Sequence, residues 1–242
     1  MRIARGTRVF VLTGAGVSAE SGVRAFRDSN GLWEEHRVED VASPEGWQKD
    51  PALVWRFYSE RRRQAKAVAP NPAHLALARL EEHLGDDFFL CTQNVDGLHE
   101  AAGSKRLVHM HGELARSRCE DPECTLEPFL DEGLYLAAEQ VPRCRQCGAR
   151  LRPHIVWFGE MPFAMHAIKR KVQECDVFLC VGSSGVVYPA AGLVGEVRYR
   201  QQNGERCRSV CVGLEAPDNA RAFDEVVAGK AGEVLPALLE LG

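Results

Sequence analysis

Five short apolar runs constrain the fold of this chain more than any other feature. Each has the length of a β-strand, and near-continuous apolar runs of this kind are typical of parallel strands that helices cover on both faces. An alternating pattern would instead indicate a strand with one face in water. The runs are Val9–Leu12, Phe88–Cys91, Leu107–Met110, Val177–Val181 and Ser209–Val212.

Helical patterns lie between or after several of these runs. The combination predicts an α/β fold with a Rossmann-like, doubly wound parallel sheet. Residues 28–70 would be a helical excursion of a small domain, and residues 117–153, with cysteines, prolines and little periodicity, an inserted zinc-binding module. The sheet domain is expected to combine residues 1–27, 71–116 and 154–242. The expected helices are Pro51–Val68, Ala73–Leu84, His166–Glu174 and Gly232–Leu241.

Small or polar residues follow every one of the five apolar runs. In open α/β sheets, ligands bind just beyond the carboxyl ends of the strands. Five such ends at one edge of a sheet therefore predict a single shared crevice, which locates the candidate site. The segments are Thr13-Gly14-Ala15-Gly16, Thr92-Gln93-Asn94-Val95-Asp96, His111-Gly112, Gly182-Ser183-Ser184 and Gly213-Leu214-Glu215.

The turn after the first run, Gly14 to Ala19, matches the dinucleotide-binding pattern G-x-G-x-x-G/A. Glycines allow a tight turn and let backbone N–H groups approach a pyrophosphate, although a plain structural turn is the alternative interpretation. A dehydrogenase also needs an acidic residue at the end of a strand about 20 residues on, and the segment after Ser21 is not a strand. The pattern therefore predicts a nucleotide held differently from that of a dehydrogenase.

Four cysteines form two close pairs, Cys119 with Cys124 and Cys144 with Cys147. Two pairs of thiolates suit a tetrahedral Zn²⁺ site, and four protein ligands leave no open position for a catalytic water. The metal would be structural. The alternatives are four unliganded thiols or a nucleic-acid-binding zinc ribbon. Acidic residues dilute the arginines around the cysteines and no aromatic platform accompanies them, so structural zinc is favoured.

The charge and cysteine content bear on location and partners. The net charge of −4 over 242 residues argues against a strongly basic nucleic-acid binder. No apolar run approaches the length of a membrane span, and Met1 to Arg8 is too short and too Arg-rich for a signal peptide. Nine cysteines without an export signal indicate a reducing compartment. We expect a cytoplasmic monomer with no direct nucleic-acid or membrane partner.

Taken in order, the motifs resemble those of the sirtuin family. The order and spacing match from about Arg8 to Leu241. Within the family the chain is similar to the bacterial and mitochondrial class that removes acidic acyl groups. The matching segments are Gly14–Ser18 continuing through Ser21–Asp28, Thr92–His99, His111-Gly112, the four cysteines, Phe158-Gly159-Glu160 and Gly182-Ser183-Ser184.

This resemblance implies a transferase that consumes NAD to remove acyl groups from lysine, with one structural Zn²⁺. In that chemistry the acyl-lysine carbonyl oxygen attacks C1′ of the nicotinamide riboside, nicotinamide leaves, and the ribose hydroxyls resolve the intermediate. The products are free lysine, nicotinamide and O-acyl-ADP-ribose. The partners would be acyl-lysine segments of proteins, with succinyl and malonyl groups preferred and acetyl groups also accepted.

The resemblance assigns the catalytic base to His111, with Asn94 and Asp96 completing the catalytic set. An imidazole suits this role because it titrates near working pH. His109 would point to the same face of an extended strand, and the residues alone do not choose between the two histidines. Only the adjoining Gly112 of the family motif selects His111.

The resemblance also implies the contacts to NAD, with Phe26 covering the reactive centre and Arg27 holding phosphate or ribose. The sequence departs from the family at Gly213, where many sirtuins carry Asn, and in the four-residue spacing of its first cysteine pair. The implied NAD-binding residues are Gly14, Ala15, Gly16, Ser18, Phe26, Arg27, Gln93, Asn94, Asp96, Gly182, Ser183, Ser184, Gly213, Leu214, Glu215 and Ala231.

The implied substrate-binding residues fall into two groups. One group would receive the peptide as an added β-strand, in which main-chain bonds tolerate many sequences. In the other, Tyr58 and Arg61 lie on one helix face and would read the acyl carboxylate, while the small Ala42 widens the pocket. Spacing alone favours the alternative, in which Arg61 belongs to the solvated run Arg61-Arg62-Arg63 or pairs with a nearby Glu. The peptide-binding residues are Phe158, Gly159, Glu160, Val186, Val187 and Tyr188.

Three other functions compete with this interpretation. An NAD-dependent dehydrogenase lacks its acidic strand end, and a zinc hydrolase lacks three ligands with an open fourth position. A non-catalytic zinc-ribbon module would bind nucleic acid with a steep salt dependence and show no turnover.

Overall fold

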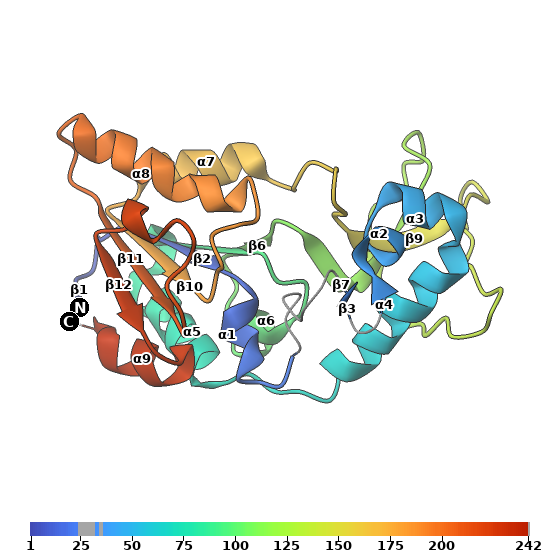
Figure 1. The fold of residues 1–242 in the computed structure, drawn as a ribbon, viewed down its shortest axis with the longest axis horizontal. Coiled ribbons are helices and arrows are strands. Elements are labelled where there is room, and N and C mark those ends of the chain that lie inside the picture. The colour runs from blue at the N-terminus through green and yellow to red at the C-terminus, as the bar shows by residue number, and fades with distance from the viewer. Residues whose placement is uncertain (24–31, 34–35, 242) are drawn as a thin grey trace.

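The computed structural model describes residues 1–23, 32–33 and 36–241. Two units lie at opposite ends of the molecule (Figure 1). The larger unit is a six-stranded sheet with helices on both faces, and the smaller unit combines helices with a three-stranded sheet. The predicted α/β class with a Rossmann-like sheet is confirmed.

All neighbouring strands of the large sheet are parallel, in the order β12-β11-β10-β2-β5-β6. In chain order this is the 3-2-1-4-5-6 arrangement of doubly wound folds, whose topological switch point lies between β2 and β10. The strands are β2 (Val9–Thr13), β5 (Phe88–Thr92), β6 (Leu107–His109), β10 (Val177–Val181), β11 (Arg208–Gly213) and β12 (Glu225–Ala228).

The five predicted strands are confirmed. The prediction succeeded because both faces of the sheet are buried. Val9 and Val11 of β2 pack into the core on one face, and Phe10 and Leu12 pack into the core on the other. A strand with two buried faces has to be continuously apolar. The sixth strand, β12, escaped prediction because it lies at the sheet edge with its residues partly exposed, which removes the apolar run.

Helices α5 (Pro72–Leu84) and α9 (Ala231–Leu238) cover one face of the sheet, and α7 (Met165–Glu174) and α8 (Leu193–Gln202) cover the other (Figure 1). Three of these were predicted, whereas α8 was missed because its sequence is largely polar. The shorter elements of this unit are α1 (Ala15–Ala19), α6 (Leu98–Ala101) and the pair β1 (Arg2–Ile3) with β13 (Glu240–Leu241).

The small unit packs α4 (Pro51–Ala65) against β7 (Gly112–Cys119) and β9 (Leu151–Ile155), around a core that contains Tyr58 and Trp157. Helix α4 begins at the capping side chain of Asp50 and ends three residues before the predicted Val68. The other elements are α2 (Val38–Val41), α3 (Pro44–Lys49), β8 (Phe129–Leu130), β3 (Leu32–Trp33) and β4 (His36–Arg37).

Within the described residues, no helix has both the length and the apolar character needed to cross a membrane.

Candidate functional site

Three glycines bring two turns into contact at the switch point of the sheet. The Gly14 N–H donates to the carbonyl of Val181 over 2.9 Å, and the Gly16 N–H donates to the carbonyl of Gly182 over 2.8 Å. A Cβ at Gly16 would lie 2.7 Å from the Gly182 Cα, and Gly182 has a positive φ of 63°. Only glycine fits this approach, and the bare backbone suits a dinucleotide pyrophosphate.

Side chains from three strand ends meet beside these glycines. The Gln93 amide donates to the Ser183 hydroxyl over 3.0 Å, and the Asn94 amide donates to the Ser18 hydroxyl over 2.9 Å. Asp96 is buried and accepts from the N–H of Leu98 over 3.1 Å, which begins α6. The structure therefore brings together polar residues that the sequence places at one crevice.

The two histidines at the end of β6 and just beyond it, His109 and His111, differ in how their ring nitrogens are used. His111 Nδ1 donates to the carbonyl of Gln93 over 3.0 Å. His109 Nδ1 donates to the carbonyl of Asn94 over 2.9 Å, and His109 Nε2 lies 2.6 Å from the Glu100 carboxylate. Both nitrogens of His109 are engaged, whereas the described residues place no hydrogen bond on Nε2 of His111.

The pKa values of the two imidazoles are also shifted in opposite directions. Burial lowers the pKa of His111, and the carbonyl of Gln93 offsets only part of that effect. Burial also lowers the pKa of His109, but the Glu100 carboxylate and the carbonyl of Asn94 together raise it above its ordinary value. At neutral pH, His111 is therefore the neutral imidazole with an available lone pair, as a general base requires.

For the remaining residues predicted to contact NAD, the structure shows separate local contacts and different degrees of burial. The carbonyl of Gly213 accepts from Gly229 over 2.9 Å at the end of β11, and Leu214 beyond it is exposed. The carbonyl of Ser184 accepts from Asp218 over 3.0 Å. Glu215 is exposed, Ala15 is half-buried at the start of α1, and Ala231 is buried at the start of α9. Phe26 and Arg27 lie outside the described residues.

The two expected peptide-binding segments present exposed side chains. Phe158 and Gly159 are exposed, and the N–H of Phe158 donates to the carbonyl of Ala42 over 3.0 Å. Glu160 is held by the guanidinium of Arg152 at 2.7 Å, which fixes the end of that segment. In the second segment Val186 and Tyr188 are exposed and Val187 is half-buried.

The arginine run on α4 is not a solvated face. Arg61 is 8% exposed and Arg62 is 4% exposed, while the side chain of Arg63 remains 65% exposed. The alternative of a solvated run is therefore wrong for Arg61 and Arg62 and holds for Arg63. Tyr58, one turn before Arg61, is fully buried, and its oxygen accepts a hydrogen bond from Trp157 Nε1 over 3.1 Å.

A small cavity of about 20 Å³ lies between this helix and the loop after β5. It is lined by Arg61 from α4 and by Asp96 from the loop after β5, together with Gly22 from the turn after α1. Arg61, predicted for acyl recognition, and Asp96, predicted for NAD binding, therefore line the same cavity.

Sequence reasoning missed Arg62, a buried side chain of α4 with several hydrogen bonds. Its Nε donates to the carbonyl of Leu114 over 2.8 Å, and its Nη1 contacts the Asp131 carboxylate at 3.2 Å. The position beside two other arginines concealed this role. The further acceptors are the carbonyls of Gly133 and Arg116 and the hydroxyl of Ser117.

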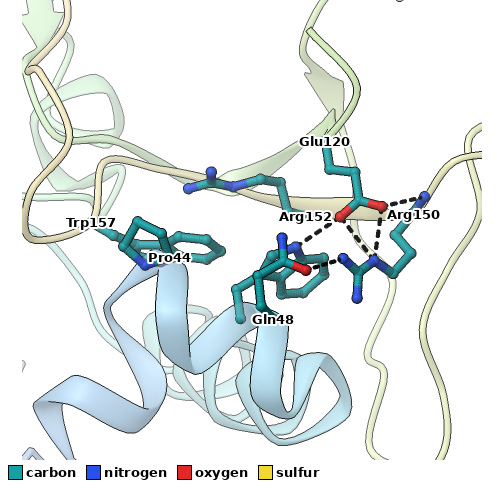
Figure 2. A pocket seen from close by; sticks show the side chains of 7 residues that line it. Pro44, Gln48, Glu120, Arg150, Arg152 and Trp157 are labelled. Atoms are coloured by element: carbon teal, nitrogen blue, oxygen red, sulfur yellow. Dashed lines mark hydrogen bonds and ion pairs between the residues drawn. The ribbon is translucent and has the colours of Figure 1, made fainter.

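A larger cavity of about 300 Å³ lies on the small unit and contains none of the predicted site residues (Figure 2). Figure 2 shows the Glu120 carboxylate facing the guanidinium of Arg150, 2.8 Å away, and the Arg152 guanidinium over the ring of Trp157, 3.4 Å from its centroid. Its charged groups are already paired, and none of its lining residues belongs to the strand ends at which the sequence predicts the site.

The four predicted zinc ligands are brought together. The sulfurs of Cys119 and Cys147 are 3.4 Å apart, those of Cys124 and Cys144 are 3.7 Å apart, and all four lie within 4.8 Å of one another. A tetrahedral Zn²⁺ with bonds of about 2.3 Å places its sulfurs roughly 3.8 Å apart. The cluster therefore fits a structural zinc.

Comparisons with known proteins agree with this geometry. Residues 14–189 match the Sir2 family. The chain is 52% identical over 230 residues to an NAD-dependent protein deacylase of Yersinia pseudotuberculosis, covering 94% of this chain and 80% of that protein. It is 48% identical over 235 residues to an NAD-dependent protein deacylase of Escherichia coli K12, covering 96% of this chain and 81% of that protein.

Solved structures give the same result. A Sir2 homologue in complex with NAD has a TM-score of 0.82 at 39% identity, covering 96% of this chain and 88% of that one. A Sir2 protein bound to acetylated peptide has a TM-score of 0.78 at 28% identity, covering 95% of this chain and 91% of that one. The expected relationship is confirmed, and the chain belongs to the Sir2 family of enzymes, the sirtuins.

Proposed function

We propose that this sirtuin is an NAD-dependent protein-lysine deacylase that prefers succinyl and malonyl groups and also accepts acetyl groups. The observation that carries the preference is the cavity that Arg61 shares with Asp96. An acyl chain that enters the crevice beside the ribose pocket would extend toward a guanidinium. A carboxylate at the end of that chain would accept charge-assisted hydrogen bonds from the guanidinium. An acetyl group has no carboxylate at this position and would accept none.

Tyr58 supplies a second donor to the same carboxylate. Burial raises the pKa of Tyr58 to about 12, so the hydroxyl keeps its proton at working pH. Because its oxygen already accepts from Trp157, the O–H proton is the part of the group that remains for a substrate oxygen. Ala42, 3% exposed where α2 ends, supports the proposal because its small side chain leaves room for a longer acyl group.

His111 would act as the base on the ribose hydroxyls of NAD. Its lowered pKa keeps the imidazole neutral, and the bond from Nδ1 to Gln93 leaves Nε2 to take the proton. Asn94 and Asp96 would orient the ribose and nicotinamide, and Ser18, Gln93 and Ser183 would hold the remainder of the cofactor. NAD supplies the electrophilic ribose carbon and accepts the acyl group, so the products are free lysine, nicotinamide and O-acyl-ADP-ribose.

Phe158-Gly159-Glu160 and Val186-Val187-Tyr188 would take the peptide as an added strand. The four-cysteine cluster would hold zinc without contact to the reaction, because a fully ligated ion has no open position. We also propose that the chain acts as a cytoplasmic monomer without direct nucleic-acid partners. The net charge of −4 supports the last of these points, because nucleic-acid binders are usually basic.

The test compares kcat/KM on acetyl- and succinyl-lysine peptides of one sequence. Arg61→Met should lower the succinyl value about 10- to 100-fold, because a hydrogen bond to a charged group contributes roughly 1.5–3 kcal/mol, and should leave the acetyl value nearly unchanged. Arg63→Met is the matched control, since its side chain is 65% exposed.

Mass spectrometry of the same incubations, with and without NAD, identifies the co-product. An unchanged succinyl rate in Arg61→Met would exclude the acyl preference and leave a plain deacetylase. Deacylation that persisted without NAD would exclude the proposed reaction altogether.

A further inference from the structure

Two thiols outside the zinc cluster lie within reach of each other at the edge of the sheet opposite the crevice. The sulfurs of Cys175 and Cys207 are 3.8 Å apart. Cys175 separates α7 from β10, and Cys207 immediately precedes β11, so the pair spans the amino ends of two neighbouring parallel strands. To form a disulfide, the two sulfurs would have to move from 3.8 Å to a bonded distance of about 2.05 Å.

The two thiols differ in access. Cys175 is 2% exposed, whereas Cys207 is half-buried with the exposed arginines 206 and 208 on either side of it. A reagent from solvent therefore meets Cys207 first, and Cys175 lies behind it. This is the arrangement of an attacking thiol with a resolving partner.

The hydrogen bond from Cys175 and the nearby Arg200 together favour a thiolate at Cys207. The buried Arg200 of α8 donates from Nη1 to the carbonyl of Cys175 over 2.8 Å and lies 3.8 Å from the Cys175 sulfur. The hydrogen bond from Cys175 lowers the pKa of Cys207, and Arg200 adds to this effect against the opposing carboxylates of Asp176 and Asp224. The thiolate is the reactive form of cysteine.

A second pair shows what is special about this one. Cys180 and Cys211 are register partners on β10 and β11, but they are 3% and 1% exposed in the middle of the sheet. Reagents from solvent do not reach them without unfolding. The chain thus contains its own control pair, which joins the same two strands and differs in access.

We propose that Cys175 and Cys207 form a redox-modification site for low-molecular-weight disulfides. The Cys207 thiolate attacks one sulfur of the small disulfide, forming a mixed disulfide and releasing one small thiolate. Cys175 then loses its proton and attacks the Cys207 sulfur, which forms the intramolecular disulfide and releases the second small thiol. Two protein thiols are oxidised and one small disulfide is reduced to two thiols.

The probe is glutathione, applied to the zinc-loaded protein in buffers of stepped reduced-to-oxidised ratio. Remaining thiols are blocked with an alkylating reagent, and peptide mapping uses fragmentation that separates Cys175 from Cys180. The wild type should yield the bond between Cys175 and Cys207. Cys175→Ser should stop at one glutathione attached to Cys207, and Cys207→Ser should leave Cys175 reduced.

Cys211→Ser is the matched control and should form the same product as the wild type. Zinc content is measured alongside, so that modification of the zinc ligands is recognised. The proposal is overturned if Cys175→Ser carries no glutathione on Cys207, or if the wild type links Cys180 to Cys211 first. It is also overturned if only the four zinc-cluster cysteines react.

Discussion

His111 donates from Nδ1 to the backbone carbonyl of Gln93 over 3.0 Å, and this bond fixes the tautomer of the imidazole. A carbonyl oxygen only accepts, so the ring proton lies on Nδ1 and the lone pair lies on Nε2. The neighbouring His109 has no such free position, because its Nε2 lies 2.6 Å from the Glu100 carboxylate.

His111→Ala should reduce kcat/KM for deacylation by about 10²- to 10⁴-fold, the usual contribution of a general base. The expected cause is the loss of an imidazole whose Nε2, among the described residues, carries no hydrogen bond. Steady-state rates on an acyl-lysine peptide measure the effect, and thermal unfolding confirms that the variant is folded. A folded His111→Ala protein that kept most of its rate would show that another group acts as the base. His109→Ala is the comparison variant, because it removes the neighbouring imidazole.

The pH profile should reflect the lowered pKa of His111. The base works when deprotonated, so activity is present above its pKa and is lost as the pH falls through it. Because burial lowers that pKa, the acid limb of log kcat/KM should have its midpoint below the ordinary histidine value of about 6.5. The measurement is kcat/KM against pH at subsaturating peptide. A midpoint above 6.5 would point to His109, whose pKa is raised.

Gly182→Ala should destabilise the protein by at least about 1–3 kcal/mol and weaken NAD binding. The new Cβ would lie 2.4 Å from the Val17 nitrogen, and the residue has a positive φ of 63°. Denaturant unfolding gives the stability and calorimetry gives the affinity. Gly195→Ala is the control, since its added Cβ meets nothing within 4 Å inside α8, and a gain of roughly 0.5–1 kcal/mol is expected. Equal effects at the two glycines would contradict the packing argument.

Arg62→Met should cost about 3–5 kcal/mol of unfolding free energy, as expected when one partner of a buried ion pair is removed. Asp131 would keep its charge without the guanidinium 3.2 Å away, and the carbonyl of Leu114 would lose its donor. Arg63→Met, at an exposed position on the same helix, should change the stability by less than about 0.5 kcal/mol. Denaturant unfolding distinguishes the two variants. A small loss of unfolding free energy in Arg62→Met would show that the hydrogen bonds of Arg62 are not needed for stability.

Trp157→Phe should lower the preference for succinyl over acetyl peptide about 3- to 10-fold, because it removes the N–H that orients Tyr58. A phenyl ring keeps an aromatic surface under the Arg152 guanidinium, 3.4 Å from the present ring centroid. Trp55→Phe is the control, since that buried indole donates instead to the carbonyl of Leu151. The ratio of the two kcat/KM values is measured, and equal ratios in both variants would remove Trp157 from acyl recognition.

The sequence by itself determined the parallel sheet and the edge at which the site lies. A strand such as β2 that is buried on both faces has to be apolar throughout, and its polar end marks where the chain leaves the core. The cysteine spacing and the glycines of the first turn were equally local signals. The edge strand β12 gave no such signal, since partial exposure relaxes the demand for apolar residues.

Only the tertiary structure decided which of two similar side chains is suited to the chemistry. His109 and His111 are alike in sequence and differ because Glu100 reaches one ring and not the other. Arg61, Arg62 and Arg63 form one run and differ because β7 and the Asp131 loop pack against one side of α4. Burial and hydrogen-bond partners come from segments distant in the chain, so no local pattern contains them.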